Sequence, residues 1–364
     1  MASAVSIIAT GEPFNKPGNL MFRAFSVGAV YLLVMVLYLV GARAEPAGPD
    51  FSGFDAWLAS TSLEAKGRGI SKATIDLAFT GLEPDPRVIG FDRKQPEFVQ
   101  TFDEYIHARV TEFRISKARD YFLQEEMLLL NIAEKYDVDP QFLVAFWGLE
   151  SSFGRYQGKY SIIRSLATLG FDARRRAFFT EELFNALQIL QEGHVSADQF
   201  VGGWAGAMGQ NQFMPSSFLN YAVDFDGDGK KNIWSSHADV WASVANYLHM
   251  NGWSKGAGWG SRVELPRGLD FENLRPVTVT SGCRALRHHT RKLSLQDWAA
   301  LGVKPISQLM ASKRYALVIP DDGVQASYLV GANFRTILSY NCANKYAVSV
   351  GLLADTMISR TSSL

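Results

Sequence analysis

The 364-residue chain has only two cysteines and no excess of either charge, with 36 basic and 36 acidic side chains. So few cysteines exclude a small scaffold held together by several disulfides. Zero net charge argues against a molecule dominated by a basic nucleic-acid-binding face. The six histidines show no zinc-binding spacing, and no glycine loop ends in the lysine and hydroxyl residue of a phosphate site. These absences remove metal-dependent hydrolysis and nucleotide chemistry.

The composition that remains is that of an ordinary globular protein. Hydrophobic residues make up 47% of the chain and aromatic residues 12%, so disorder, coiled coil and collagen-like repeats are excluded. A chain of this length exceeds what one hydrophobic core usually serves. We therefore expect two or three packed lobes.

The amino terminus has the layout of a secretory signal. Residues 24–40 carry no charge, Lys16 and Arg23 precede them, and Ala42-Arg43-Ala44 comes after them. This is the order of basic region, apolar region and small-residue cleavage site. The alternative is an uncleaved membrane anchor, although the run is at the short limit for spanning a bilayer. We expect export to the periplasm with cleavage after Ala44.

Export changes the interpretation of the two cysteines. Cys283 and Cys342 would meet an oxidising compartment, where a pair can form a disulfide. Two buried free thiols are the alternative, and the sequence leaves both open.

Local signals predict helices first and short strands later. Ser71 is placed to cap a helix, and Asp139 followed by Pro140 marks the start of another. An amphipathic stretch runs from residue 115 to 133, and its apolar face, with Met127 and Leu130, should pack on the next part of the chain. Beyond residue 260 we expect strands at 277–280, 315–319 and 328–330 and a last helix at 346–357.

Glu150 is the candidate for acid chemistry. It stands at the carboxyl end of an apolar helix, with Phe146 and Trp147 one turn earlier and Phe153 just after it. Apolar surroundings and the negative end of the helix dipole both disfavour a carboxylate, which suits a general acid. The alternative is a glutamate that points outward or pairs with Arg155.

A glycine-rich segment covers residues 202–217. Small residues at this density let backbone approach backbone or ligand. Its aromatic and amide side chains are of the kinds that bind sugars: they are Trp204, Gln210, Gln212 and Phe213. A tightly packed loop is the alternative.

An acidic loop matches the front half of a calcium loop. Asp224, Asp226 and Asp228 fall at positions 1, 3 and 5, and Lys230 at position 7 would offer its carbonyl. Ser235 occupies position 12, where a bidentate glutamate is usual, and Asp239 could close the site instead. We expect one structural cation, with Ca²⁺ as the favoured ion and an acidic turn that holds no ion as the alternative.

Taken together, these motifs resemble the lytic murein transglycosylase B family. The resemblance runs from about residue 51 to 354 and is carried by the segments 147–154, 166–169, 174–176, 205–217 and the aspartate loop. It implies an α+β, mainly helical fold with a lysozyme-like catalytic core, a helical lobe and a small β-containing lobe. The implied boundaries are a leader at 1–44, a helical lobe at 45–120, the core at 121–262, the β-containing lobe at 263–340 and a terminal helix at 341–364.

The resemblance also implies an activity on bacterial peptidoglycan. Glu150 would protonate the bond between N-acetylmuramic acid and N-acetylglucosamine and then act as base, giving a 1,6-anhydro end without a cofactor. The implied substrate-binding residues are Arg175, Arg176, Gln212, Tyr247, Tyr340, Asn341 and Tyr346. Gly203 and Phe179 stand where the family often has serine and tyrosine, which puts two hydrogen bonds to sugar in doubt. We expect a monomer that acts on glycan strands, with wall-synthesis or division proteins as candidate partners.

Two other functions stay open from the sequence. One is a muramidase that hydrolyses the same bond with water. The other is a non-catalytic wall-binding protein of the same fold, although the retained Glu150 argues against it. A calcium sensor is less well supported, because sensors usually carry paired loops.

Overall fold

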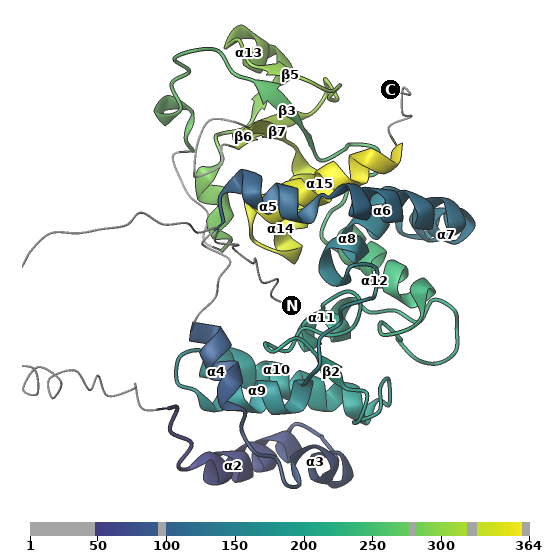
Figure 1. Ribbon diagram of the computed structural model, residues 1–364, viewed down its shortest axis with the longest axis vertical. Helices are drawn as coiled ribbons and strands as arrows, with labels where there is room; N and C mark the ends of the chain where they lie inside the picture. Colours follow the sequence, from purple (N-terminus) through teal and green to yellow (C-terminus); the bar gives the residue numbers. More distant parts are fainter. Residues whose placement is uncertain (1–47, 94–99, 277–281, 319–325, 359–364) are drawn as a thin grey trace, which may run out of the picture. The chain divides into compact units, whose positions relative to one another are not determined.

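The computed structural model describes residues 48–93, 100–276, 282–318 and 326–358, and from Pro49 onward the chain forms one compact unit (Figure 1). The first helices are α2 (Phe54–Gly67), α3 (Lys72–Phe79), α4 (Pro86–Arg93), α5 (Phe102–Arg109), α6 (Glu112–Gln124), α7 (Glu126–Tyr136) and α8 (Pro140–Ser151). The middle contains β1 (Tyr160–Ser161), α9 (Ile162–Phe171), α10 (Arg176–Gln191), β2 (Val201–Gly202), α11 (Pro215–Tyr221) and α12 (His237–Met250). The last part contains β3 (Gly260–Glu264), η2 (Glu272–Leu274), η3 (Arg284–His288), β4 (Leu293–Ser294), α13 (Leu295–Ala300), β5 (Lys304–Pro305), β6 (Arg314–Val318), β7 (Ser327–Val330), α14 (Ala332–Tyr340) and α15 (Asn344–Ile358).

The start signals of two helices are confirmed, but one works differently from expectation. The Ser71 side chain accepts a hydrogen bond from the backbone N–H of Thr74 and so caps α3. Asp139 stands at the cap position of α8, yet its side chain makes no cap bond. Its carboxylate instead accepts hydrogen bonds from Trp253 Nε1 and from the backbone N–H of Gly256, both at 2.9 Å. Asp139 therefore ties the start of α8 to the segment after α12.

The prediction of one amphipathic stretch over residues 115–133 is wrong. The chain breaks at Glu125, between α6 and α7. Met127 and Leu130, expected on the packed face, are 81% and 47% exposed, whereas Leu129, Ile132 and Ala133 are buried. Because of this break, the apolar face of α7 is not in line with that of α6. The prediction assumed one continuous helix with a 3.6-residue period and therefore placed the apolar face on the wrong residues.

A small antiparallel sheet comes after the helices. Its strand order is β4-β6-β7-β3-β5, with Leu317 of β6 paired to Leu329 of β7. The strands expected near 315–319 and 328–330 are confirmed as β6 and β7. β3 was not expected, and the strand expected at 277–280 lies outside the described residues.

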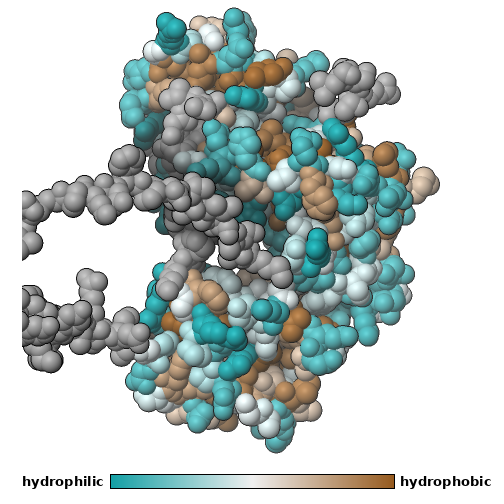
Figure 2. Space-filling view, viewed as in Figure 1, coloured by the Kyte–Doolittle hydropathy of each residue, from teal (hydrophilic) through white to brown (hydrophobic). Residues whose placement is uncertain are grey.

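The sheet encloses a hydrophobic core of its own, separate from the larger helical core. The small core consists of Val263, Leu274, Trp298, Val303, Tyr315, Leu317 and Leu329. Trp298 is fully buried and donates its Nε1–H to the carbonyl of Tyr315 at 2.9 Å. Figure 2 shows a mainly hydrophilic surface in this view, with a hydrophobic patch over α13 and β5. Two cores explain how one compact unit can carry a helical part and a β-containing part.

The leader expected at residues 1–44 lies outside the described residues, so its cleavage stays a prediction. Of the helices that are described, none has the length and apolar character needed to cross a bilayer.

We predict that Asp139→Ala destabilises the fold by about 1–3 kcal/mol, because it leaves the N–H groups of Trp253 and Gly256 without their acceptor. The measurement is the free energy of unfolding from urea titration. Ser71→Ala, which removes only a cap, should cost about 1 kcal/mol. An Asp139→Ala protein as stable as the wild type would contradict the assigned contacts.

Candidate active site

Glu150 lies one residue before the end of α8, at a sharp change of chain direction. The residues of α8 from Phe142 to Gly148 are buried, and Glu150 is half-buried. Ser152, Phe153 and Gly154, just beyond the helix, all have positive φ, at 50°, 60° and 79°. Two of them are not glycine, and left-handed backbone at such residues is costly and concentrates at functional sites. The turn stops the helix there, so the chain leaves the site directly after Glu150.

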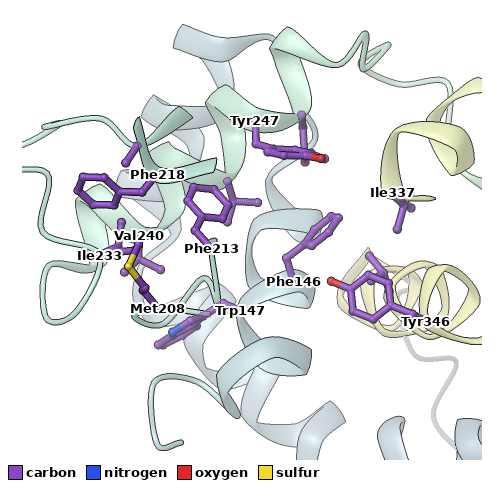
Figure 3. Close-up of a cluster of buried hydrophobic side chains, with 14 of the residues drawn as sticks. Phe146, Trp147, Met208, Phe213, Phe218, Ile233, Val240, Tyr247, Ile337 and Tyr346 are labelled. Atoms are coloured by element: carbon purple, nitrogen blue, oxygen red, sulfur yellow. The ribbon is translucent and has the colours of Figure 1, made fainter. Parts of the chain in front are cut away.

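Tyr346 of α15 holds the Glu150 carboxyl. Its hydroxyl donates a hydrogen bond to Glu150 Oε1 at 2.5 Å, and its side chain is 5% exposed. Figure 3 shows this hydroxyl directed from α15 toward Phe146 of α8. Burial and then the negative charge of Glu150 raise the pKa of Tyr346 well above its usual range. Tyr346 is therefore a neutral donor at neutral pH and below.

A cluster of aromatic side chains, which we call the aromatic wall, lies beside Glu150. It consists of Phe146, Phe213, Tyr247 and Tyr340. The Tyr340 ring lies 4.7 Å from that of Phe146 and 4.8 Å from that of Tyr247, measured between centroids. The Phe213 ring lies 5.7 Å from that of Tyr340. The Tyr340 hydroxyl donates to the backbone carbonyl of Asn211 at 2.6 Å. Burial raises the pKa of both Tyr247 and Tyr340, so both are neutral hydroxyl groups.

The structure thus brings together four of the residues suggested by the sequence, Glu150, Tyr247, Tyr340 and Tyr346. Asn341, which comes directly after α14, is exposed beside them in the chain. Asn211 was missed, because it contributes through its backbone carbonyl, which no side-chain pattern reveals.

The glycine-rich segment packs backbone against backbone. A Cβ at Gly202 would meet the carbonyl oxygen of Ala207 at 2.1 Å, and one at Gly209 would meet Ile233 at 2.7 Å. Gly209 also has φ 62°, so glycine is required there for two reasons. The sequence left two interpretations of this segment, a sugar-binding loop and a tightly packed loop. These backbone contacts favour the tightly packed loop for most of the segment.

The named side chains of that segment are buried or half-buried, and its glutamines have hydrogen-bond partners within the protein. Gln210, expected among the sugar-binding amides, is 5% exposed; it accepts from Trp147 Nε1 at 2.6 Å and donates to the carbonyl of Trp234 at 2.8 Å. Gln212 is half-buried and donates to the carbonyl of Gly209 at 2.8 Å. A Cβ at Gly203 would lie 3.5 Å from Gln212 Oε1. A serine at position 203 would thus stand beside Gln212, and this chain lacks that hydroxyl.

Arg175 and Arg176 lie at the amino end of α10 and have structural partners. Arg175 Nη1 lies 3.8 Å from Asp92 Oδ1 of α4, and Arg174 forms a closer ion pair with the same carboxylate. Arg176 donates to the carbonyl of Phe171 at 2.6 Å. These arginines also line a groove of about 790 Å³ together with Trp57 of α2. Their expected role in substrate binding stays a prediction.

Three of the expected metal ligands converge. Carboxylate oxygens of Asp224, Asp226 and Asp239 lie within 4.8 Å of one another. Two ligands of one Ca²⁺ are at most about 5 Å apart, twice the usual bond length, so the three can share an ion. Burial raises the pKa of Asp239. The backbone N–H groups of Phe225 and Asn232 donate hydrogen bonds to its carboxylate, which lowers the pKa, but the effect of burial is larger.

The other two expected ligands are arranged differently. Asp228 Oδ1 accepts from the backbone N–H of Lys230 at 2.8 Å, and Asp228 is outside the converging group. Its place in the coordination shell, and that of the Lys230 carbonyl, stay predictions.

A disulfide and two hydrogen bonds fix the loop between α14 and α15. Cys283 and Cys342 are bonded, with their Cα atoms 5.4 Å apart. Asn344 donates to the carbonyl of Ala285 at 3.0 Å, and its Oδ1 lies 2.9 Å from His289 Nε2. Burial lowers the pKa of His289 to about 4, so a neutral ring donates to Asn344. This loop separates Tyr340 from Tyr346, and its attachment therefore positions both.

Comparison with known proteins gives matches over most of the chain. A family profile described as the Transglycosylase SLT domain matches residues 53–355. The chain is 34% identical over 248 residues to the membrane-bound lytic murein transglycosylase B of Escherichia coli (strain K12), which covers 68% of this chain and 64% of that relative. The match therefore spans less than two thirds of the length of that relative.

Solved structures share the fold. SltB3 from Pseudomonas aeruginosa in complex with NAG-anhNAM-pentapeptide matches with a TM-score of 0.76 and 39% identity, over 84% of this chain and 79% of that chain. The Escherichia coli lytic transglycosylase Slt35 in complex with calcium matches with a TM-score of 0.68 and 28% identity, over 85% of this chain and 95% of that chain. The expected fold, α+β and mainly helical with a lysozyme-like core, is confirmed by these matches.

We predict that replacing both Cys283 and Cys342 by serine destabilises the protein by about 4 kcal/mol, since the disulfide closes a loop of 59 residues. The same change should lower activity by loosening Tyr346. Thermal melts with and without reductant are the measurement, and the double serine variant, which has no disulfide to reduce, is the control. Equal melting temperatures of the fully reduced and oxidised wild type would contradict the prediction.

Proposed function

The chain belongs to the transglycosylase SLT domain family, as its motifs indicated, and we propose that it is a lytic transglycosylase of peptidoglycan that uses Glu150 as acid and then as base. The observation that carries the proposal is the hydrogen bond from the buried, neutral Tyr346 to Glu150 Oε1. It fixes one oxygen of a half-buried carboxyl and so orients the other. A proton donor must be held in position before its acidity can be used.

The proposed reaction balances without water. Glu150 protonates the glycosidic oxygen that leaves C1 of the N-acetylmuramic acid residue, and the C1–O bond breaks. The N-acetyl group of the same sugar stabilises the cationic C1. The Glu150 carboxylate then removes the proton from the C6 hydroxyl, whose oxygen bonds to C1 and forms the 1,6-anhydro ring. Glu150 ends protonated, as it began.

The surroundings of Glu150 support one carboxyl used twice. Glycosidases that hydrolyse their substrate place two carboxyl groups about 5–10 Å apart across the bond. The group that the structure places on Glu150 Oε1 is the neutral hydroxyl of Tyr346, which cannot serve as a second carboxylate. SltB3, a structural relative, is in complex with an anhydro-sugar ligand, NAG-anhNAM-pentapeptide. We infer the same class of product for this chain.

We assign substrate contact to the edge of the aromatic cluster and to the exposed groups beside it. Gln212 and Asn341 offer amides that are half-buried and exposed, the state in which a polar group can reach a ligand. Tyr247 is 7% exposed, so it supports the wall more than it presents surface. Arg175 and Arg176 are proposed to meet anionic groups of the substrate, as charge-assisted donors.

The disulfide supports export. Disulfides persist in oxidising compartments and are rare in the cytosol, and this chain joins Cys283 to Cys342. We therefore propose that the chain acts in the periplasm, exported through its leader.

We predict that Glu150→Gln reduces lysis of purified peptidoglycan by more than the roughly 10²- to 10⁴-fold expected for losing one general acid, because the same group also serves as base. The amide keeps the shape of the side chain but cannot deliver the proton. The measurement is release of soluble fragments by the purified variant.

Glu182→Gln is the matched control for a buried glutamate. Glu182 accepts from Ser216 N–H and Oγ, at 2.8 and 2.6 Å, so its change should lower stability while leaving most activity in the folded protein. Retention of more than a few per cent of lysis by Glu150→Gln would refute the proposed acid.

We also propose that the aspartate loop holds a structural cation, with Asp224, Asp226 and Asp239 as ligands. The convergence of their oxygens supports it, as does the calcium complex of the relative Slt35. Ca²⁺ suits the site better than Mg²⁺, because it tolerates irregular oxygen shells. No catalytic step passes through this ion.

We predict that a chelator lowers the melting temperature and that Ca²⁺ restores it. Binding to the folded state alone adds about 2.7 kcal/mol when free ion is a hundredfold above its dissociation constant. Asp226→Asn should remove the response to chelator, whereas Asp198→Asn, at an exposed acid of another loop, should keep it. A melt of the wild type that does not respond to chelator or calcium would refute the assignment.

A further inference from the structure

Two cavities flank one pair of cationic side chains outside the site described above. The first has a volume of about 270 Å³ and is lined by His289, Thr290 and Arg291 among others. The second has a volume of about 310 Å³ and includes Leu338 and Ser339 of α14. Lys292 and Arg335 line both cavities. The two cavities thus share Lys292 and Arg335 at their border, and we call them together the Lys292–Arg335 hollow, between the η3 to β4 segment and α14.

Positive charge gathers at this hollow although the whole chain has no net charge. No acidic residue occurs between Glu272 and Asp297, or from residue 332 to residue 354. Within the described ranges neither Lys292 nor Arg335 forms an ion pair with a carboxylate. Burial and then the charge of Arg335 lower the pKa of Lys292, as expected for a partly buried cation beside a second cation.

The other titratable residues described at the two cavities, His289 and Arg291, supply no negative charge. His289 is buried and donates to Asn344, and its lowered pKa of about 4 keeps it neutral. Thr290 uses its hydroxyl to donate to the carbonyl of Arg291 and to accept from Leu317 N–H. Among the described residues that line the two cavities, the charged ones are the cations Arg291, Lys292 and Arg335, so the hollow would attract an anion.

We propose that the Lys292–Arg335 hollow binds a carboxylate of the peptide stem on the peptidoglycan strand. The proposal rests on the proposed function for its source of ligand. A lysine and an arginine that line the same two cavities suit a carboxylate, which can accept hydrogen bonds from both. Asn251 and Thr336 also line the second cavity. Their side-chain donors are used on the carbonyls of Tyr247 and Asn251, so their side-chain oxygens can act as acceptors for a peptide.

The position of the hollow fits a peptide attached to a sugar at Glu150. Leu338 and Ser339 directly precede Tyr340, whose ring contacts that of Phe146. Arg335 lies five residues before Tyr340, about 7.5 Å along the helix axis. A stem of five residues reaches up to about 17 Å when extended. The axial separation of Arg335 and Tyr340 is therefore well within the length of an extended stem.

The test is a calorimetric titration of the wild-type protein with the sugar-free pentapeptide stem at low ionic strength. We expect binding that weakens with added salt, because the attraction is between charges near the surface. Lys292→Gln combined with Arg335→Gln should weaken it by at least about tenfold, the loss of one charge-assisted hydrogen bond. A stem with all carboxyl groups amidated should show the same loss against the wild type, without any substitution.

Arg287→Gln is the matched control, since Arg287 is exposed in the same segment and lines neither cavity. This substitution should change the affinity for the stem by no more than about twofold, because an exposed surface charge contributes little to binding. An equal loss in Arg287→Gln, equal affinity for the amidated stem, or tighter binding of inorganic phosphate than of the stem would each overturn the proposal. The titration measures binding and breaks no bond. A negative titration would therefore not affect the proposal that Glu150 cleaves the glycan, and a loss of that proposal would not change the result of the titration.

Discussion

The arrangement depends on one hydrogen bond between residues 196 positions apart, from Tyr346 of α15 to Glu150 of α8. It exists because α15 packs along α8 (Figure 1), which buries the tyrosine and keeps its hydroxyl neutral. The loop before α15 is in turn attached to the η3 segment by a disulfide and by Asn344. The last part of the chain thus completes a site that the middle of the chain begins. Any change that shifts α15 should disturb the acid before it disturbs the fold.

Much of the family-like sequence around the site forms packing contacts within the protein. Gln210 joins Trp147 to the carbonyl of Trp234, and Gly202 and Gly209 let loop backbones come into contact. Phe213 is buried between Tyr247 and Tyr340. These residues hold the end of α8 against the glycine-rich segment. The motif therefore specifies a rigid frame, and the chemistry is left to a few groups at its edge, as preorganised catalysis requires.

Local features were predictable from the sequence, and long-range contacts were not. The cap at Ser71, the start of α8 at Pro140 and the convergence of Asp224, Asp226 and Asp239 depend on residues close together in the chain. The partners of Asp139 and Gln210 were not predictable, because Trp253 and Trp147 lie 114 and 63 residues away. The break at Glu125 was missed because nothing in its composition marks it, and only the packing of α7 selects it. The role of Tyr346 came from the resemblance, since periodicity alone places it in a buried helix.

The central claim is that one carboxyl, Glu150, cleaves the glycan without consuming water. The most direct measurement is mass spectrometry of the fragments released from purified peptidoglycan in water enriched in ¹⁸O. Cleavage by Glu150 without water should give 1,6-anhydro ends, which are lighter than reducing ends by one water and lack the heavy isotope. Reducing ends that carry one ¹⁸O atom would contradict it and would identify a hydrolytic muramidase in its place.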